Sequence, residues 1–148
     1  MDFTDTPEEA AFRVKARSFL AENAQPKAGG DRNLATGADK SGMLAASRPW
    51  QAKKAAAGFA GITMAKEYGG QGLSPIMEVI YRQEEGEFIA PRGVYEIGLG
   101  MCIPTMLAYA TEEQKQRYAG PALRGEEIWC QLFSEPAGGS DLAGLRTR

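Results

Sequence analysis

The spacing of apolar and polar positions predicts a first helix that begins after Thr6 and ends near Asn23. Thr6 suits the N-cap, Pro7 has no N–H to lose at the first helical position, and Glu9 completes a capping box. Apolar side chains then recur at helical spacing, at Phe12, Ala16, Phe19 and Leu20. The segment therefore predicts an amphipathic helix with one face in a core.

The next stretch, residues 25–42, has glycines at positions 29, 30 and 37 and little apolar material, which predicts a loop. A short helix is expected over 49–57, because Gly58 ends it and Trp50 with several alanines supplies a buried face. The glycine-rich residues 68–72 then predict a turn. This part of the chain combines one helix with irregular connections.

Two later helices carry clear start signals. A helix over 75–88 follows Ser74 as cap and has proline at its first position. Another opens with a capping box at Thr111 and Gln114 and ends before Gly125. Both signals predict helices that connect through short loops.

Between these two lies a helix expected over 94–109, which Pro104 must kink or interrupt. Its section 98–107 carries no charge, so we expect this helix at the centre of a bundle. Gly98 and Gly100 leave room either for a neighbouring helix or for a ligand channel, and we favour plain core. Trp50 and Trp129 are interpreted as core anchors.

The last segment starts as an apolar run over 128–133, which is short enough for a strand. Pro136 then breaks the pattern, and the glycines at 138 and 139 let backbone amides approach a ligand closely. Ser140 or Asp141 suits the cap of a short helical turn, whose free N–H groups favour an anionic or carbonyl-rich ligand. This pattern predicts a ligand-facing turn.

Together these elements predict an all-α helical bundle with a short extended segment at its C-terminal end. Residues 1–128 form the expected helical domain, and residues 129–148 start a separate segment. A chain of 148 residues is long enough for one domain with one core.

Composition narrows the possible functions. The formal net charge is −2, which gives no general attraction to nucleic acid or to anionic membranes. The chain has no histidine, which excludes a Ser-His-Asp triad and any His-ligated metal within it. Cys102 and Cys130 are interpreted as small buried side chains. With no apparent signal peptide or membrane-spanning run, we expect a cytoplasmic protein.

Four stretches of the chain resemble one family. Residues 133–144 read F-S-E-P-A-G-G-S-D-L-A-G, which resembles the S/T-E-P-x-A/G-G-S-D motif of the acyl-CoA dehydrogenases. Trp50 with 58–61, the K-E-Y-G-G-Q-G of 66–72, and the T-E-E-Q-K-Q of 111–116 agree with the family in order and spacing. One departure is Met64-Ala65, where family members usually have Trp-Pro.

The resemblance implies an FAD-dependent enzyme that converts an acyl-CoA thioester to a trans-2-enoyl-CoA. It further implies an electron-transfer flavoprotein as acceptor and a homodimer or homotetramer. The family's β-domain and catalytic base lie further along the chain than Arg148, so we name no catalytic residue. We expect this chain to be an inactive fragment of a longer enzyme.

The same resemblance assigns residues to the cofactor by position. Gln131, Phe133 and Ser134 are expected to contact the isoalloxazine of FAD. Gly139 and Ser140 are expected beside the FAD, with Ser140 also at the pantetheine of the substrate. Glu135 is interpreted as a turn-fixing acceptor for backbone N–H groups rather than a general base.

Two alternatives stay open. A helical interaction module that kept this scaffold without the chemistry would bury its apolar surface and need no flavin. A simple nucleotide-phosphate binder built on the glycines of 138–140 is disfavoured, because no P-loop lysine and no G-x-G-x-x-G follow a strand. The acyl group itself is not specified by these residues.

Overall fold

The computed structural model describes residues 4–27, 40–136 and 138–147. The described residues are mainly helical, which confirms the all-α prediction. The α-helices are α1 (Pro7–Asn23), α2 (Lys40–Ala56), α3 (Pro75–Gly86), α4 (Ile103–Tyr109) and α5 (Glu112–Leu123). The shorter elements are η1 (Lys66–Tyr68), η2 (Gly93–Tyr95), η3 (Gly98–Cys102), η4 (Leu142–Gly144), β1 (Gln25–Pro26) and β2 (Phe88–Ile89).

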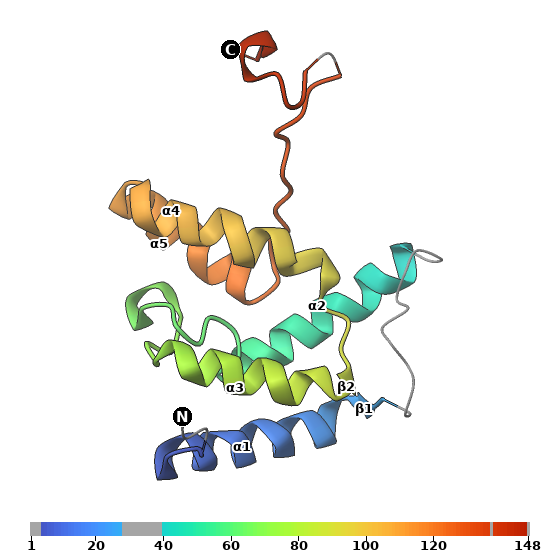
Figure 1. The fold of residues 1–148 in the computed structure, drawn as a ribbon, viewed down its shortest axis with the longest axis vertical. Coiled ribbons are helices and arrows are strands. Elements are labelled where there is room, and N and C mark those ends of the chain that lie inside the picture. Colours follow the sequence, from blue (N-terminus) through green and yellow to red (C-terminus); the bar gives the residue numbers. More distant parts are fainter. Residues whose placement is uncertain (1–3, 28–39, 137, 148) are drawn as a thin grey trace.

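Figure 1 shows the helices as stacked layers. Helix α1 lies along α3, and α4 and α5 lie together on the far side of α3 from α1. Helix α2 contacts α5 and is joined to α3 by the Lys54–Glu85 ion pair. From the α4–α5 layer the C-terminal segment projects away from the helices and ends in a small loop. The helical body and this projecting segment are therefore distinct regions of the molecule.

Both predicted capping boxes are present. The Thr6 hydroxyl accepts from the N–H of Glu9 at 3.3 Å, and the Glu9 carboxylate accepts from the N–H of Thr6 at 2.7 Å. Thr111 and Gln114 make the same reciprocal pair at the start of α5. Each box satisfies N–H groups that a helix start leaves free, which confirms these two starts.

Helix α2 begins earlier than predicted, at Lys40 instead of Pro49. The helix formers Met, Leu and Ala at 43–46 extend it across Pro49, which occupies its interior. The Ser47 hydroxyl donates to the Met43 carbonyl at 2.7 Å, one turn before the proline. Of the predicted loop, residues 28–39 lie outside the described residues.

Helix α3 ends at Gly86, two residues before the predicted end. Phe88 instead belongs to β2, which pairs antiparallel with β1 so that Phe88 lies opposite Pro26. Two-residue strands leave no periodic signal in the sequence, so this pairing was not predicted. Ser74 precedes the helix in an extended conformation, but its side chain makes no capping hydrogen bond.

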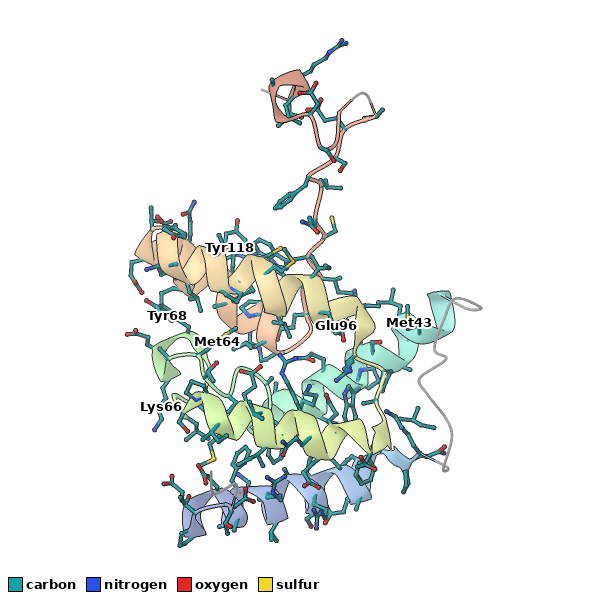
Figure 2. All side chains as sticks on the ribbon, viewed as in Figure 1. Met43, Met64, Lys66, Tyr68, Glu96 and Tyr118 are labelled. Carbon is teal, nitrogen blue, oxygen red and sulfur yellow. The ribbon has the colours of Figure 1, made fainter. Side chains whose placement is uncertain are left out.

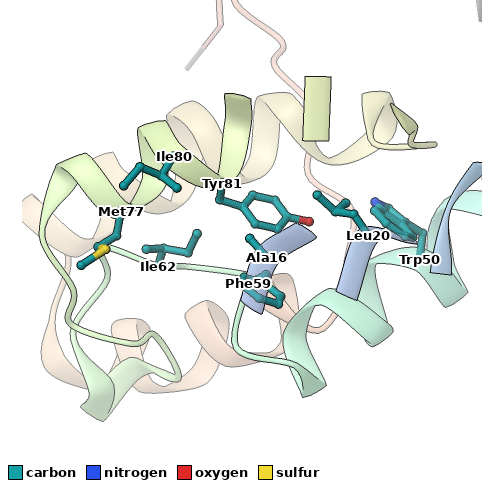
Figure 3. Packing of buried hydrophobic residues seen from close by; sticks show 8 residues of the cluster. All are labelled: Ala16, Leu20, Trp50, Phe59, Ile62, Met77, Ile80 and Tyr81. Carbon is teal, nitrogen blue, oxygen red and sulfur yellow. The ribbon is translucent and has the colours of Figure 1, made fainter. Parts of the chain in front are cut away.

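The first hydrophobic cluster joins α1, α2, α3 and the loop after α2 (Figure 3). At its centre the rings of Phe59 and Tyr81 stack with centroids 4.9 Å apart. Trp50 is almost fully buried here, which confirms its interpretation as a core anchor. The buried members are Ala16, Leu20, Trp50, Phe59, Ile62, Met77, Ile80 and Tyr81.

The region 94–109 differs most from its prediction. It forms η2, then η3 as a π-helix, and only then α4, with Pro104 in the first turn of α4. It is not central, because Ile97 and Met101 are 37% and 45% exposed. Tyr95, Gly98 and Ile103 are its buried residues, and Ile103 belongs to a second cluster with Ala119 and Ala122. An uncharged sequence therefore lies in an outer layer with one face open.

Candidate functional site

Residues 134–147 form a compact loop at the tip of the projecting segment. Glu135 and Gly138 exchange both of their backbone hydrogen bonds, at 2.8 and 3.2 Å. The Glu135 carboxylate accepts from the backbone N–H groups of Arg146, at 2.9 Å, and Thr147, at 2.7 Å, and from the Thr147 hydroxyl. The predicted role of Glu135 as a turn-fixing acceptor is confirmed.

The hydrogen bonds to Glu135 favour its charged form. The Thr147 hydroxyl and the amides of Arg146 and Thr147 together hold the pKa of the Glu135 carboxyl below its usual value. An ionised carboxylate that already accepts these bonds is a poor proton acceptor for chemistry. The loop therefore uses Glu135 to hold its own two ends together.

Residues 128–134, here called the stalk, connect α5 to this loop. The predicted strand-like run is extended, but its backbone makes no hydrogen bond to any other described residue. Its base is fixed by Trp129, whose ring packs edge-on against Tyr118 with centroids 5.3 Å apart. Beyond the base, Leu132 and Phe133 are 86% and 75% exposed. The stalk thus presents unpaired backbone groups together with apolar side chains.

The structure shows where the five predicted cofactor residues lie. Gln131, Phe133 and Ser134 are exposed on the stalk, and Gly139 and Ser140 are exposed on the loop. Ser134 and Gly139 come together, since a Cβ placed on Gly139 would lie 3.7 Å from the Ser134 Oγ. Asp141 precedes the predicted helical turn, which is η4. Ser134 and Gly139 are therefore neighbours, and all five residues are exposed on the same projecting segment.

The residues present fit the expected flavin. A flavin ring edge combines carbonyl oxygens and ring nitrogens, which need donors and acceptors at fixed positions. The Ser134 hydroxyl, the Gln131 amide and the free backbone N–H groups of the stalk supply such partners, and Phe133 supplies an apolar face. With no side chain, Gly139 leaves the space beside Ser134 open.

A second feature is a groove between the layers, with a volume of about 810 Å³. It runs between α3 on one side and η3 with α4 on the other, over a floor made by residues 59–65. Met64 and Tyr68 lie near one end and Glu96 near the other (Figure 2). We call this space the interlayer groove.

The two glycines that sequence reasoning left open have different roles. A Cβ on Gly98 would lie 3.2 Å from the Trp129 Cβ, so Gly98 lets the base of the stalk pack against η3. Gly100 has no atom within 4 Å of its Cβ position and lines the interlayer groove. The preference for plain core therefore holds for Gly98 and fails for Gly100, because η3 has an open face.

Other expectations concern single residues. Cys130 is exposed and Cys102 is partly exposed, so the interpretation of both as buried side chains is wrong. The reason is that Cys130 belongs to the stalk, whose apolar sequence is not covered by the helices.

No set of three metal-ligating side chains occurs in residues 4–27, 40–136 and 138–147. Among these same residues, no helix has the length and apolar character to span a bilayer.

Comparison with known proteins gives the family. The acyl-CoA dehydrogenase N-terminal domain matches residues 6–126. The acyl-CoA dehydrogenase IpdE1 of Mycobacterium tuberculosis is 34% identical over 137 residues, which are 92% of this chain and 35% of that protein. The chain belongs to the acyl-CoA dehydrogenase family. This confirms the resemblance that the four motifs indicated.

Solved structures agree in fold. The crystal structure of the ChsE4-ChsE5 complex from Mycobacterium tuberculosis matches with a TM-score of 0.71 and 30% identity, over 99% of this chain and 35% of that chain. The Tcur3481-Tcur3483 steroid ACAD matches with a TM-score of 0.66 and 27% identity, over 100% of this chain and 37% of that chain. The chain thus spans about a third of the length of the relatives it matches.

Proposed function

We propose that this chain is the N-terminal part of an FAD-dependent acyl-CoA dehydrogenase that forms a trans-2-enoyl-CoA from an acyl-CoA thioester. The observation that carries the proposal is that Ser134 and Gly139 lie together on an exposed segment of a chain of this family. Bound FAD supplies the acceptor for the hydride that leaves the β carbon. The base that takes the α proton is proposed to lie outside these residues.

In this proposal the stalk and loop bind and orient the ligands. Residues 129–148 begin the flavin-contacting segment, and residues 1–128 form the helical domain that supports it. Ser134, Gln131 and Phe133 would hold the flavin ring, with the Ser134 hydroxyl as a hydrogen-bond donor, and Gly139 would leave room for it beside the backbone. Ser140 donates to the pantetheine of the acyl-CoA. Fixed donors beside a ring that gains negative charge stabilise its reduced form.

The assembled enzyme is proposed as a cytoplasmic homodimer or homotetramer that passes electrons to an electron-transfer flavoprotein. The ChsE4-ChsE5 relative, a complex, supports an oligomer. The exposed Leu132 and Phe133 support a covering domain on the stalk, because apolar side chains this exposed favour burial in an interface. The 148 residues alone are expected to show no acyl-CoA oxidation, and substantial turnover would contradict the proposal.

The test uses the protein expressed from its complete gene. Purified protein should carry FAD, and an acyl-CoA thioester added without oxygen should bleach the visible flavin absorbance. Ser134→Ala should slow this bleaching about tenfold, the size of one lost hydrogen bond to a charged group. The matched control is Ser74→Ala, whose exposed hydroxyl makes no capping bond. A protein without flavin, or a Ser134→Ala variant equal to the control, would contradict it.

The second candidate is a helical interaction module without chemistry. Such a module should remain monodisperse without flavin and should bury its apolar side chains. Its stalk would need a partner for Leu132 and Phe133 that is independent of FAD. Analytical ultracentrifugation with and without FAD separates the two candidates, because only the dehydrogenase requires the cofactor for its assembled state.

A further inference from the structure

We propose that Trp129 is a positioning residue for the flavin site, because its packing against Tyr118 and Gly98 sets the direction in which the stalk presents its side chains. The inference rests on the proposed function, since it concerns the residues that hold the flavin there. Three observations carry it: the two contacts that hold Trp129, the ion pair that precedes it, and the lack of backbone hydrogen bonds from the stalk to any other described residue.

Trp129 is held by two elements, α5 and η3. Its ring packs edge-on against Tyr118 of α5, with centroids 5.3 Å apart, a geometry that stabilises aromatic pairs beyond simple burial. Its backbone lies close to η3, because a Cβ on Gly98 would be 3.2 Å from the Trp129 Cβ and 3.6 Å from the Trp129 backbone nitrogen. Trp129 also packs against the second hydrophobic cluster. Both its ring and its backbone are therefore fixed.

An ion pair supports this anchor. Two residues before Trp129, the Glu127 carboxylate accepts a hydrogen bond from the Arg117 guanidinium at 2.7 Å. The same guanidinium lies 4.8 Å from the centroid of the Tyr118 ring, which is the ring that receives Trp129. The pair is partly exposed and adds little free energy, so we assign the positioning role to Trp129 and not to Glu127.

Beyond Trp129 the stalk is not fixed by the helices. Residues 130–134 are exposed, and their backbone makes no hydrogen bond to any other described residue (Figure 1). Ser134 lies five residues further on, which is roughly 17 Å along an extended chain. A tilt of about 10° at Trp129 would therefore move Ser134 by roughly 3 Å. A binding site requires its groups within about 0.5 Å of the productive position, so the anchor decides where Ser134 lies.

Trp129 also fixes which side of the stalk each side chain takes. In an extended segment successive side chains point to opposite sides, so Gln131 and Phe133 share the side of Trp129 and Ser134 takes the opposite side. A half-turn of the stalk about its own axis would exchange the two sides. The packing of Trp129 opposes that half-turn, because the ring would lose its contacts with Tyr118 and the second cluster.

The experiment is a double-mutant cycle on FAD binding, measured by flavin fluorescence on the protein expressed from its complete gene and freed of flavin. Ser134→Ala should weaken FAD binding about fivefold, the size of one lost hydrogen bond. In a Trp129→Ala background the same change should have less than a twofold effect, because the Ser134 hydroxyl no longer has a fixed place. Trp129→Phe keeps an aromatic edge for Tyr118 and should restore the fivefold effect. The control background is Ile80→Val, which trims the first cluster and should leave the effect at fivefold.

A pair of glycine variants tests the same contact from the side of η3. Gly98→Val should abolish the effect of Ser134→Ala, whereas Gly93→Val should leave it unchanged, because Gly93 is exposed and has nothing within 4 Å of its Cβ position. An equal effect of Ser134→Ala with Trp129 and with alanine at position 129, or the same loss of the effect in Ile80→Val, would overturn the positioning role and leave the dehydrogenase. A wild-type protein that binds no FAD would overturn both.

Discussion

The helical body differs from the stalk and its loop in the burial of apolar side chains and in the pairing of polar groups. In the body, apolar side chains such as Leu20 and Ile80 are buried, and the carboxylates of Glu84 and Glu85 form ion pairs with other helices. In the stalk, Leu132 and Phe133 are exposed and the backbone is unpaired within the described residues. A region whose apolar side chains are buried contributes stability. A region with exposed apolar side chains and unpaired backbone groups is available to bind ligands or another domain. The two regions should therefore respond differently to the same substitution.

The largest contrast is expected between Ile80→Ala and Leu132→Ala. Ile80 is 1% exposed, and its truncation leaves a cavity in the first cluster, which costs about 2–5 kcal/mol. Leu132 is 86% exposed, so its truncation removes no packing and should change stability by less than about 0.5 kcal/mol. Urea unfolding followed by circular dichroism checks both, and similar losses would break the comparison.

The next contrast concerns glycines. Gly125 has φ of +77°, and a Cβ there would lie 2.9 Å from Gln51 and 3.0 Å from the Tyr95 hydroxyl. The Gln51 amide and the Tyr95 hydroxyl also donate to the carbonyls of Leu123 and Gly125, which link the two layers. Gly125→Ala should lower the free energy of unfolding by about 1–3 kcal/mol. Gly139→Ala is the control, and its thermal midpoint should match that of the wild type.

A third prediction concerns the ion pairs between α1 and α3. The Glu84 carboxylate accepts from Arg17 at 2.8 and 3.0 Å and from Arg13 at 3.0 Å, and these partners hold its pKa below the usual value. Glu84→Gln should lower the free energy of unfolding by about 1–2 kcal/mol near neutral pH. This is toward the lower end of the range for charge-assisted hydrogen bonds, because Arg17 is largely exposed.

The pH dependence of this pair has a definite sign. A carboxyl group with a lowered folded pKa contributes stability above the unfolded value, about 4.3, and loses it as the pH falls through the folded value. The difference between wild type and Glu84→Gln should therefore shrink below about pH 4. Chemical unfolding at several pH values tests this, and a difference that grows on acidification would contradict it.

The smallest effect on overall stability is expected for Glu135→Gln. Its carboxylate holds only the amides and hydroxyl at the end of the loop, away from the helices. The thermal midpoint of the helical body should stay unchanged, while hydrogen exchange of the Arg146 and Thr147 amides should become faster. A loss of cooperative unfolding would show that the loop supports the body.

Local signals in the sequence predicted much of the fold. The capping boxes at Thr6 and Thr111 fixed two helix starts, because their chemistry is contained within four residues. Pro49 misled the prediction of α2, since a proline at a helix start and one inside a helix look alike in a single sequence. The π-helix η3 packs at Gly98 against Trp129, a residue well beyond it in the chain, and leaves no periodic signal in the sequence.

The candidate site was predictable only in part. The motif around Ser134 located the loop, and the chemistry of Glu135 as an acceptor followed from its turn residues. The groove was foreseen only as the less favoured alternative of a ligand channel at Gly98 and Gly100, because its walls come from α3, η3 and the loop after α2, and no local pattern encodes their separation. The exposure of the stalk was also missed, since an apolar run looks the same whether the chain's own helices cover it or not.

The π-helical turn η3 borders both the base of the stalk and the interlayer groove. On one side it receives Trp129 at Gly98, and on the other it borders the groove at Gly100, so a single turn of backbone separates the two features. Because Gly98 and Gly100 are two residues apart, the backbone of η3 fixes the position of the stalk's base relative to the groove. The same five residues of η3 therefore contact both the stalk and the groove.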